Sequence, residues 1–125
     1  MSQKHKKQFG IWMDNHHAVV VGRGDGEEAT FDVIGHAGNE GARPNSSEKT
    51  EHNDEKTLQH KFFKEILSHM QNADEVHVTG TGTAQEQLMK YMSETPQYKH
   101  TVTTESTSNK MSDESFVKFI DTKFN

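Results

Sequence analysis

Four carboxylates stand where a metal-dependent nuclease could use them. Cleavage of a phosphodiester by two metal ions needs converging carboxylates that hold the ions about 4 Å apart. Asp14 ends the first strand-like run, Asp54 and Glu55 open the first helical segment, and Asp121 lies in the last one. The alternative is that Asp14 shapes a tight turn together with Asn15, and we favour this interpretation. A metal-dependent nuclease therefore stays the principal enzymatic alternative.

The 9 histidines raise the question of a metal site, because imidazole is the commonest transition-metal ligand in proteins. His16 and His17 share a turn, where their side chains diverge. His60 and His69 are about two and a half helical turns apart, and His77 is isolated in a strand-like run. No HxH or HExxH spacing occurs. We predict no metal site and no cofactor, and we interpret the histidines as solvated surface residues.

A glycine turn joins a β-branched run to an amphipathic helical pattern. Free amides at a helix start can hold an anion, so this turn is a candidate anion-binding site. Its residues are Gly80, Thr81, Gly82 and Thr83. The string GTGTAQ is not GxGxxG, and no Lys-Ser/Thr pair completes a P-loop. We favour a tight corner that packs the helix on the sheet, and Thr83 with Glu86 predicts a capping box there.

The charge of the chain limits its possible partners. A net charge of −5 argues against strong nonspecific binding of nucleic acid, which needs clustered Lys and Arg. Three lysines, Lys4, Lys6 and Lys7, lie within residues 1–8, and without them the net charge falls from −5 to −8. We predict a flexible basic tail over residues 1–8 that is a candidate contact for RNA phosphates. The alternative is a solvated chain end without a partner.

The composition favours one small domain. Hydrophobic residues make up 30% of the 125 residues and charged ones 26%, but the apolar residues cluster in periodic blocks. We therefore expect a single ordered α/β domain over residues 9–125. The absence of cysteine excludes disulfides and thiolate metal sites, and no apolar run approaches the roughly 20 residues of a membrane span. We predict a cytoplasmic protein without a membrane contact, either a monomer or a homodimer.

The hydrophobic pattern changes its period along the chain. Three strand-like runs with hairpin-length turns come first, and a loop over residues 36–52 follows, which we expect to be mobile. Helical and extended patterns then alternate. The predicted strands are residues 9–14, 17–24, 28–35, 75–79 and 98–105, and the predicted helices begin near Asn53, Thr83 and Ser112.

This order of elements predicts the sheet. Consecutive strands with hairpin-length connections pair antiparallel, whereas strands separated by helices join in parallel through right-handed crossovers. The result is an α/β fold with a mixed five-stranded sheet and helices on both faces, in the element order of the ribonuclease H-like group. We expect Phe9, Trp12 and Phe31 in its core.

The run ADEVHVTGTGTAQEQLMKYMSE resembles a stretch in Pelota and the eukaryotic and archaeal class-one release factors. In that family a strand ends in Gly-Pro-Gly and opens a helix, and Thr81 stands here where the proline usually is. The resemblance covers roughly residues 8–124, because the order of strands and helices is also similar to the central domain of the family. Small bacterial relatives of that domain are similar at this turn.

The resemblance also bears on activity. Release factors carry a Gly-Gly-Gln tripeptide between the third strand and the first long helix, where it triggers peptidyl-tRNA hydrolysis. The corresponding loop here, GHAGNEGARPNSSEKTEHN, contains no glutamine. Pelota also lacks the tripeptide, so the resemblance implies a non-catalytic binding module that contacts the ribosome or tRNA in translation. Another alternative is a protein-interaction module that uses the 36–52 loop.

Overall fold

Five strands form one mixed sheet in the spatial order β3-β2-β1-β4-β5. β1 pairs antiparallel with β2 and parallel with β4, and β5 pairs parallel with β4. This confirms the predicted α/β fold with a mixed five-stranded sheet. The strands are β1 (Gln8–Met13), β2 (His17–Arg23), β3 (Phe31–Gly38), β4 (Glu75–Gly80) and β5 (Val102–Thr107). The structure is a computed structural model that describes residues 7–14, 16–23, 30–38, 55–70 and 73–124.

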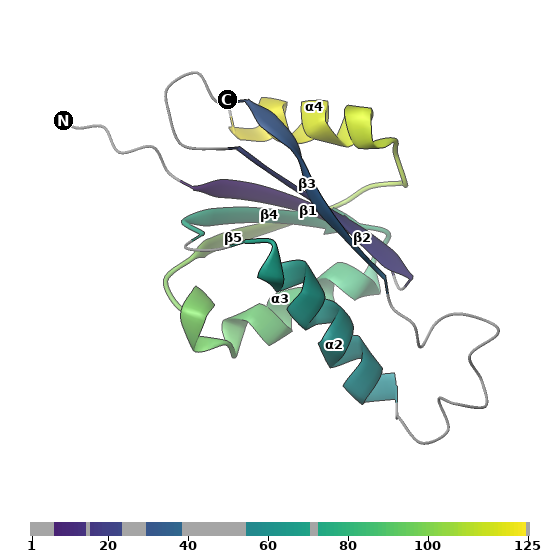
Figure 1. The fold of residues 1–125 in the computed structure, drawn as a ribbon, viewed down its shortest axis with the longest axis vertical. Coiled ribbons are helices and arrows are strands. Elements are labelled where there is room, and N and C mark those ends of the chain that lie inside the picture. Colours follow the sequence, from purple (N-terminus) through teal and green to yellow (C-terminus); the bar gives the residue numbers. More distant parts are fainter. Residues whose placement is uncertain (1–6, 15, 24–29, 39–54, 71–72, 125) are drawn as a thin grey trace.

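Helices cover both faces of the sheet, as predicted (Figure 1). α2 (Glu55–Ser68) and α3 (Thr83–Ser93) lie on one face, and α4 (Asp113–Phe124) lies on the other. A short 3-10 helix, η3 (Pro96–Tyr98), follows α3 and begins at the proline, which lacks the N–H that a continuing helix would need. Within the described residues, no helix is long and apolar enough to cross a membrane.

The larger part of the core lies between the sheet and α2 with α3. Alternate residues of β1 and β4 point to this side and meet the apolar stripes of the two helices. Its fully buried members include Ile11, Val20, Ile66, Val78 and Leu88.

A second apolar cluster lies under α4. Trp12, Val21 and Phe31 of the sheet pack there against Phe116 and Ile120 of the helix. These contacts place the predicted core aromatics Trp12 and Phe31 inside, and Phe9 is buried on the opposite face. The Oγ of Ser112 accepts a hydrogen bond from the Ser115 N–H at 3.1 Å, so a serine caps α4 at the residue expected from the sequence.

The third strand lies three residues later than predicted. β3 begins at Phe31 and continues to Gly38, so residues 36–38 of the predicted loop are strand, while residues 39–52 lie outside the described residues. The pairing with β2 shifts between Val20 and Val21, so β3 contains one extra residue. This bulge turns Phe31 toward α4 and Ala37 toward the opposite core, which breaks the simple alternation that the prediction used.

The fifth strand also begins later than predicted. β5 runs over residues 102–107 instead of 98–105. Tyr98 belongs to η3, where its hydroxyl bonds the carbonyl oxygens of Leu67 and Met70 at 3.2 and 3.1 Å. The Tyr98 side chain is buried and bonded to the end of α2, so this residue packs with the helices. β5 therefore begins only after it.

The sheet begins within residues 1–8, which were predicted to be a flexible basic tail. Gln8 is the first residue of β1, and the Lys7 carbonyl accepts hydrogen bonds from the N–H groups of Asp74 and Glu75. The Lys7 N–H in turn donates to the Asp74 carboxylate at 2.8 Å. Lys4 and Lys6 lie outside the described residues.

Candidate functional site

The glycine turn after β4 is a close contact between two strands. Gly80 pairs with Met13, the last residue of β1. A Cβ on Gly80 would overlap the Met13 carbonyl oxygen, so glycine alone permits this approach. Gly82 has a φ of +154°, a conformation that residues with a side chain rarely adopt. Both glycines therefore serve the backbone geometry of the corner.

Gln85 holds this corner together from inside. Its side chain is fully buried, and its Oε1 accepts a hydrogen bond from the Gly82 N–H at 2.9 Å. Its Nε2 donates to the carbonyl oxygens of Ser106 at 3.2 Å and Gly80 at 3.4 Å. One amide thus joins the start of α3 to the ends of β4 and β5.

The predicted capping box of Thr83 and Glu86 is wrong. The N-cap of α3 is Gly82, and Thr83 is already the first helical residue. Gln85 therefore occupies the third helical position, where a Glu or Gln side chain can reach back to the N-cap N–H. The glycine corner displaces the cap by one residue, and the glutamine in GTGTAQ was the sequence signal for it.

In the candidate anion-binding turn, Gly80 to Thr83, one backbone N–H already donates a hydrogen bond within the protein. The Gly82 N–H bonds Gln85, so an anion at this turn would have to compete with a buried amide or rely on the next amides of α3. Anion binding by Gly80, Thr81, Gly82 and Thr83 stays a prediction.

Asp14 shapes the turn between β1 and β2. Its Oδ1 accepts hydrogen bonds from the N–H groups of His16 and His17, both at 2.8 Å. The His17 ring nitrogen Nδ1 lies 3.6 Å from the same oxygen. Burial raises the pKa of Asp14, but these backbone hydrogen bonds and the two histidines outweigh it, so the pKa lies below its ordinary value.

The other acids of the nuclease hypothesis come from different parts of the fold. Asp121 lies on α4, across the sheet from α2, which begins at Glu55. Asp54 and the Glu55 side chain lie outside the described residues. Among the residues described, no three His, Asp or Glu side chains gather closely enough to hold a metal ion. The nuclease site at Asp14, Asp54, Glu55 and Asp121 stays a hypothesis, and the described residues do not bring its carboxylates together at one metal site.

The prediction of a solvated surface histidine is wrong for His77. His77, in the middle of β4, is fully buried, and its ring nitrogens lie 2.7 Å from the Thr104 Oγ1 and 2.8 Å from the Ser106 Oγ. Burial, with a smaller contribution from Lys123, lowers its pKa from 6.5 to about 4. Two hydroxyls of β5 thus form hydrogen bonds with both nitrogens of a neutral imidazole. The sequence around His77 gives no sign of these partners, because they lie on another strand.

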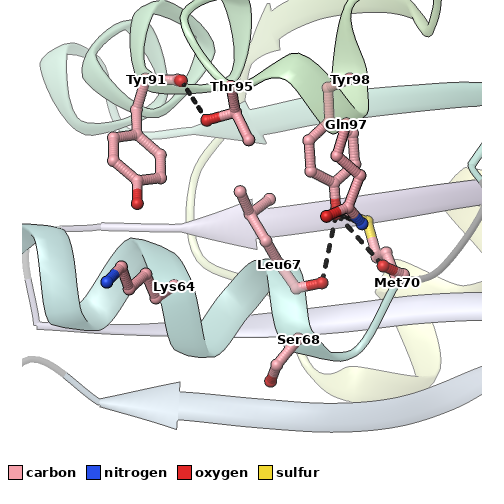
Figure 2. A pocket seen from close by; sticks show the side chains of 8 residues that line it. All are labelled: Lys64, Leu67, Ser68, Met70, Tyr91, Thr95, Gln97 and Tyr98. Atoms are coloured by element: carbon pink, nitrogen blue, oxygen red, sulfur yellow. Dashed lines mark hydrogen bonds between the residues drawn. The ribbon is translucent and has the colours of Figure 1, made fainter.

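A groove lies between α2 and the α3–η3 segment (Figure 2). Its volume is about 390 Å³, and it is open to solvent. Leu67, Met70 and Tyr98 supply buried apolar surface, while Lys64 and Tyr91 carry polar groups at the rim. The full lining consists of Lys64, Leu67, Ser68, Met70, Tyr91, Thr95, Gln97 and Tyr98. Sequence reasoning missed this groove, because its walls lie on separate helices.

Comparison with solved structures bears on the whole fold. The chain is similar to the Pelota protein of Thermoplasma acidophilum, with a TM-score of 0.58 and 14% identity over 92% of this chain and 32% of that one. It is also similar to Archaeoglobus fulgidus Pelota, with a TM-score of 0.55 and 12% identity over 97% of this chain and 35% of that one. The fold is Pelota-like.

This Pelota-like fold is seen in the structure and not in direct sequence comparison. No protein-family model matches the chain, and no curated protein matches it. The chain spans about a third of the length of the Pelota proteins to which it is similar. At 12 to 14% identity the comparison shows the arrangement of the backbone, and the roles of individual residues must come from this molecule alone.

Proposed function

We propose that this chain is a non-catalytic binding module that contacts the ribosome or tRNA in translation. The observation that supports it best is the Pelota-like fold over 92 to 97% of the chain. The resemblance of the glycine corner to the central domain of Pelota and the release factors points the same way. The loop between β3 and α2 contains no Gly-Gly-Gln, so the proposal does not include peptide release.

The basic residues near the start of the chain are the proposed contact with RNA phosphates. Lys4, Lys6 and Lys7 give this segment three positive charges on an otherwise acidic chain. The Lys7 backbone bonds Asp74 and Glu75, which fixes the point at which the segment leaves the sheet. Phosphate contacts of this kind would be weak and sensitive to salt.

Sedimentation with purified ribosomes tests the proposal. We expect the full chain in the ribosomal fraction at low salt, and several-fold less of a variant with Lys4, Lys6 and Lys7 changed to Gln, because each lost phosphate contact weakens binding. A matched control changes three exposed lysines of the helices, Lys61, Lys90 and Lys118, to Gln. Absence of the unmodified chain from ribosomes at low salt contradicts the proposal, and equal losses in both variants remove the lysine segment from it.

A separate assay addresses catalysis. The chain is incubated with RNA in the presence of Mn²⁺ or Mg²⁺, and we expect no cleavage above a buffer control. Cleavage that disappears in Asp14→Asn would contradict a non-catalytic role and support the nuclease alternative. Cleavage that persists in this variant would contradict the non-catalytic role but remove Asp14 from the site.

A further inference from the structure

We propose that the groove between α2 and the α3–η3 segment binds a partner peptide in which an aliphatic side chain stands next to a carboxylate. This site is independent of the proposed ribosome contact, which involves the lysines at the start of the chain. The argument rests on the floor of the groove, on its unpaired polar groups and on its shape.

The floor of the groove is apolar and held in place. Leu67, Met70 and Tyr98 line it but are only 8%, 0% and 4% exposed, so they are packed in the core and reach the groove along narrow apolar edges. The Tyr98 hydroxyl bonds the carbonyl oxygens of Leu67 and Met70, which ties η3 to the end of α2. The floor is therefore already ordered before any partner binds. Binding of an aliphatic side chain would cost little conformational entropy in these three residues.

The rim presents two donors without partners. Lys64 and Tyr91 lie at the same end of the groove, on opposite walls (Figure 2). Among the described residues neither the Lys64 ammonium nor the Tyr91 hydroxyl has a hydrogen bond or an ion pair. The Tyr91 ring packs against His60 and Phe63, with centroids 5.1 and 5.4 Å away, so its hydroxyl is held in position.

Three further polar side chains line the walls, and one of them, Gln97, donates from its Nε2 to the Tyr98 hydroxyl at 3.5 Å. The Ser68 hydroxyl donates to the Glu65 carbonyl at 2.6 Å, and the Thr95 hydroxyl donates to the Tyr91 carbonyl at 2.8 Å. The groove therefore offers a cation and a phenol as donors beside the Gln97 amide, and a carboxylate can accept hydrogen bonds from both donors.

The shape of the groove favours a peptide over an enclosed small ligand. Its volume of about 390 Å³ lies near the lower end of ligand-binding pockets, which is enough for one aliphatic side chain and its acidic neighbour. Because the hollow is open to solvent, the peptide can extend beyond it.

NMR titration of the full chain tests this site. The probe is acetyl-Ala-Leu-Glu-Ala-amide, and its Gln counterpart differs only in the carboxylate. We expect the Glu peptide to shift backbone amides at residues 64–68 and 91–98 and to bind about three- to fivefold more tightly than the Gln peptide. Lys64→Gln removes this preference and Tyr91→Phe reduces it, whereas Lys61→Gln, an exposed lysine on the same helix outside the groove, retains it.

Three results would overturn the proposal. Equal binding of the two peptides would show that the carboxylate is not recognised. Shifts outside the groove, or none at millimolar peptide, would show that the site does not bind this chemistry. Isocaproate carries the same aliphatic group and a carboxylate without a peptide backbone. If it bound as tightly as the Glu peptide, the groove would be assigned to a small organic acid instead.

Discussion

The carbonyl oxygen of Met13 occupies the space into which a side chain on Gly80 would project. These two residues end neighbouring parallel strands, β1 and β4, which lie far apart in the sequence. The contact brings β4 to its end directly beside β1, and α3 begins three residues later. Glycine at position 80 thus lets β4 end against the Met13 backbone before the chain turns into α3.

The two glycines of the corner should respond differently to alanine. We expect Gly80→Ala to lower the free energy of unfolding by about 3 kcal/mol, because the new Cβ meets backbone that cannot move aside. Gly82→Ala should cost about 1–2 kcal/mol, since space is available and only the positive φ is unfavourable. Urea denaturation measures both values. Similar losses for the two variants would argue against the steric account of Gly80.

The buried amide of Gln85 should be a major contributor to stability. Gln85→Leu leaves the Gly82 N–H and the Ser106 carbonyl without this partner, and we expect a loss of about 2–3 kcal/mol in the free energy of unfolding. Gln87→Leu, two residues further along α3 and exposed, is the matched control and should change stability by no more than about 0.5 kcal/mol. An equal effect of both changes in thermal denaturation would refute the role of Gln85.

The alternation of backbone groups along β5 can be read from its two ends. The Val102 N–H donates to the Asp74 carbonyl at 3.0 Å, and the Ser108 N–H donates to the Gly80 carbonyl at 2.7 Å. Backbone N–H directions alternate along a strand. The N–H groups of the even-numbered residues of β5 therefore point toward β4, and those of the odd-numbered residues point away from the sheet. β5 is the last strand of the sheet, so within the described residues no further strand pairs with the outward groups.

Proline substitutions should therefore separate the two sides of β5. Thr104→Pro removes an N–H that faces β4 together with the hydroxyl that bonds His77, and we expect a loss of about 3 kcal/mol or more. Thr104→Ala, which removes only the hydroxyl, is the reference from which the effect of the N–H is measured. Glu105→Pro removes an outward N–H and should cost less than half as much. Thermal denaturation followed by circular dichroism gives the comparison. A larger loss for Glu105→Pro would mean that its N–H is paired.

His77 should make the fold sensitive to acid. Its pKa in the folded protein is about 4, below the ordinary value of 6.5, so the unfolded chain binds the proton first as the pH falls. Stability should be fully present above pH 6.5 and should decline between about pH 6.5 and pH 4, by about 3 kcal/mol.

Urea denaturation at a series of pH values measures this decline. His77→Gln, which cannot titrate, should show a flatter profile over the same pH range. His100→Gln, at an exposed position, serves as the control and should retain the profile of the unmodified chain. An unchanged slope in His77→Gln would rule out burial of this imidazole as its cause.

Local patterns were sufficient for the elements and for their order. The apolar run of β1, the β-branched run of β2, the apolar stripe of α2 and the serine cap of α4 depend on residues close together in the chain. The mixed sheet with helices on both faces could therefore be predicted. Boundaries failed where a distant partner decided them. The bulge in β3 depends on its register with β2, and the late start of β5 depends on Tyr98 bonding the end of α2.

The sequence by itself determined the α/β architecture, the corner after β4 and the lack of a Gly-Gly-Gln loop, because these follow from local periodicity and residue identity. Only the tertiary structure decided why the corner needs Gly80, how His77 is buried and neutral, and which side chains form the groove of Lys64 and Tyr91. Each of these properties arises from a contact between segments that are distant in the chain, and their proximity depends on how the whole sheet and its helices pack.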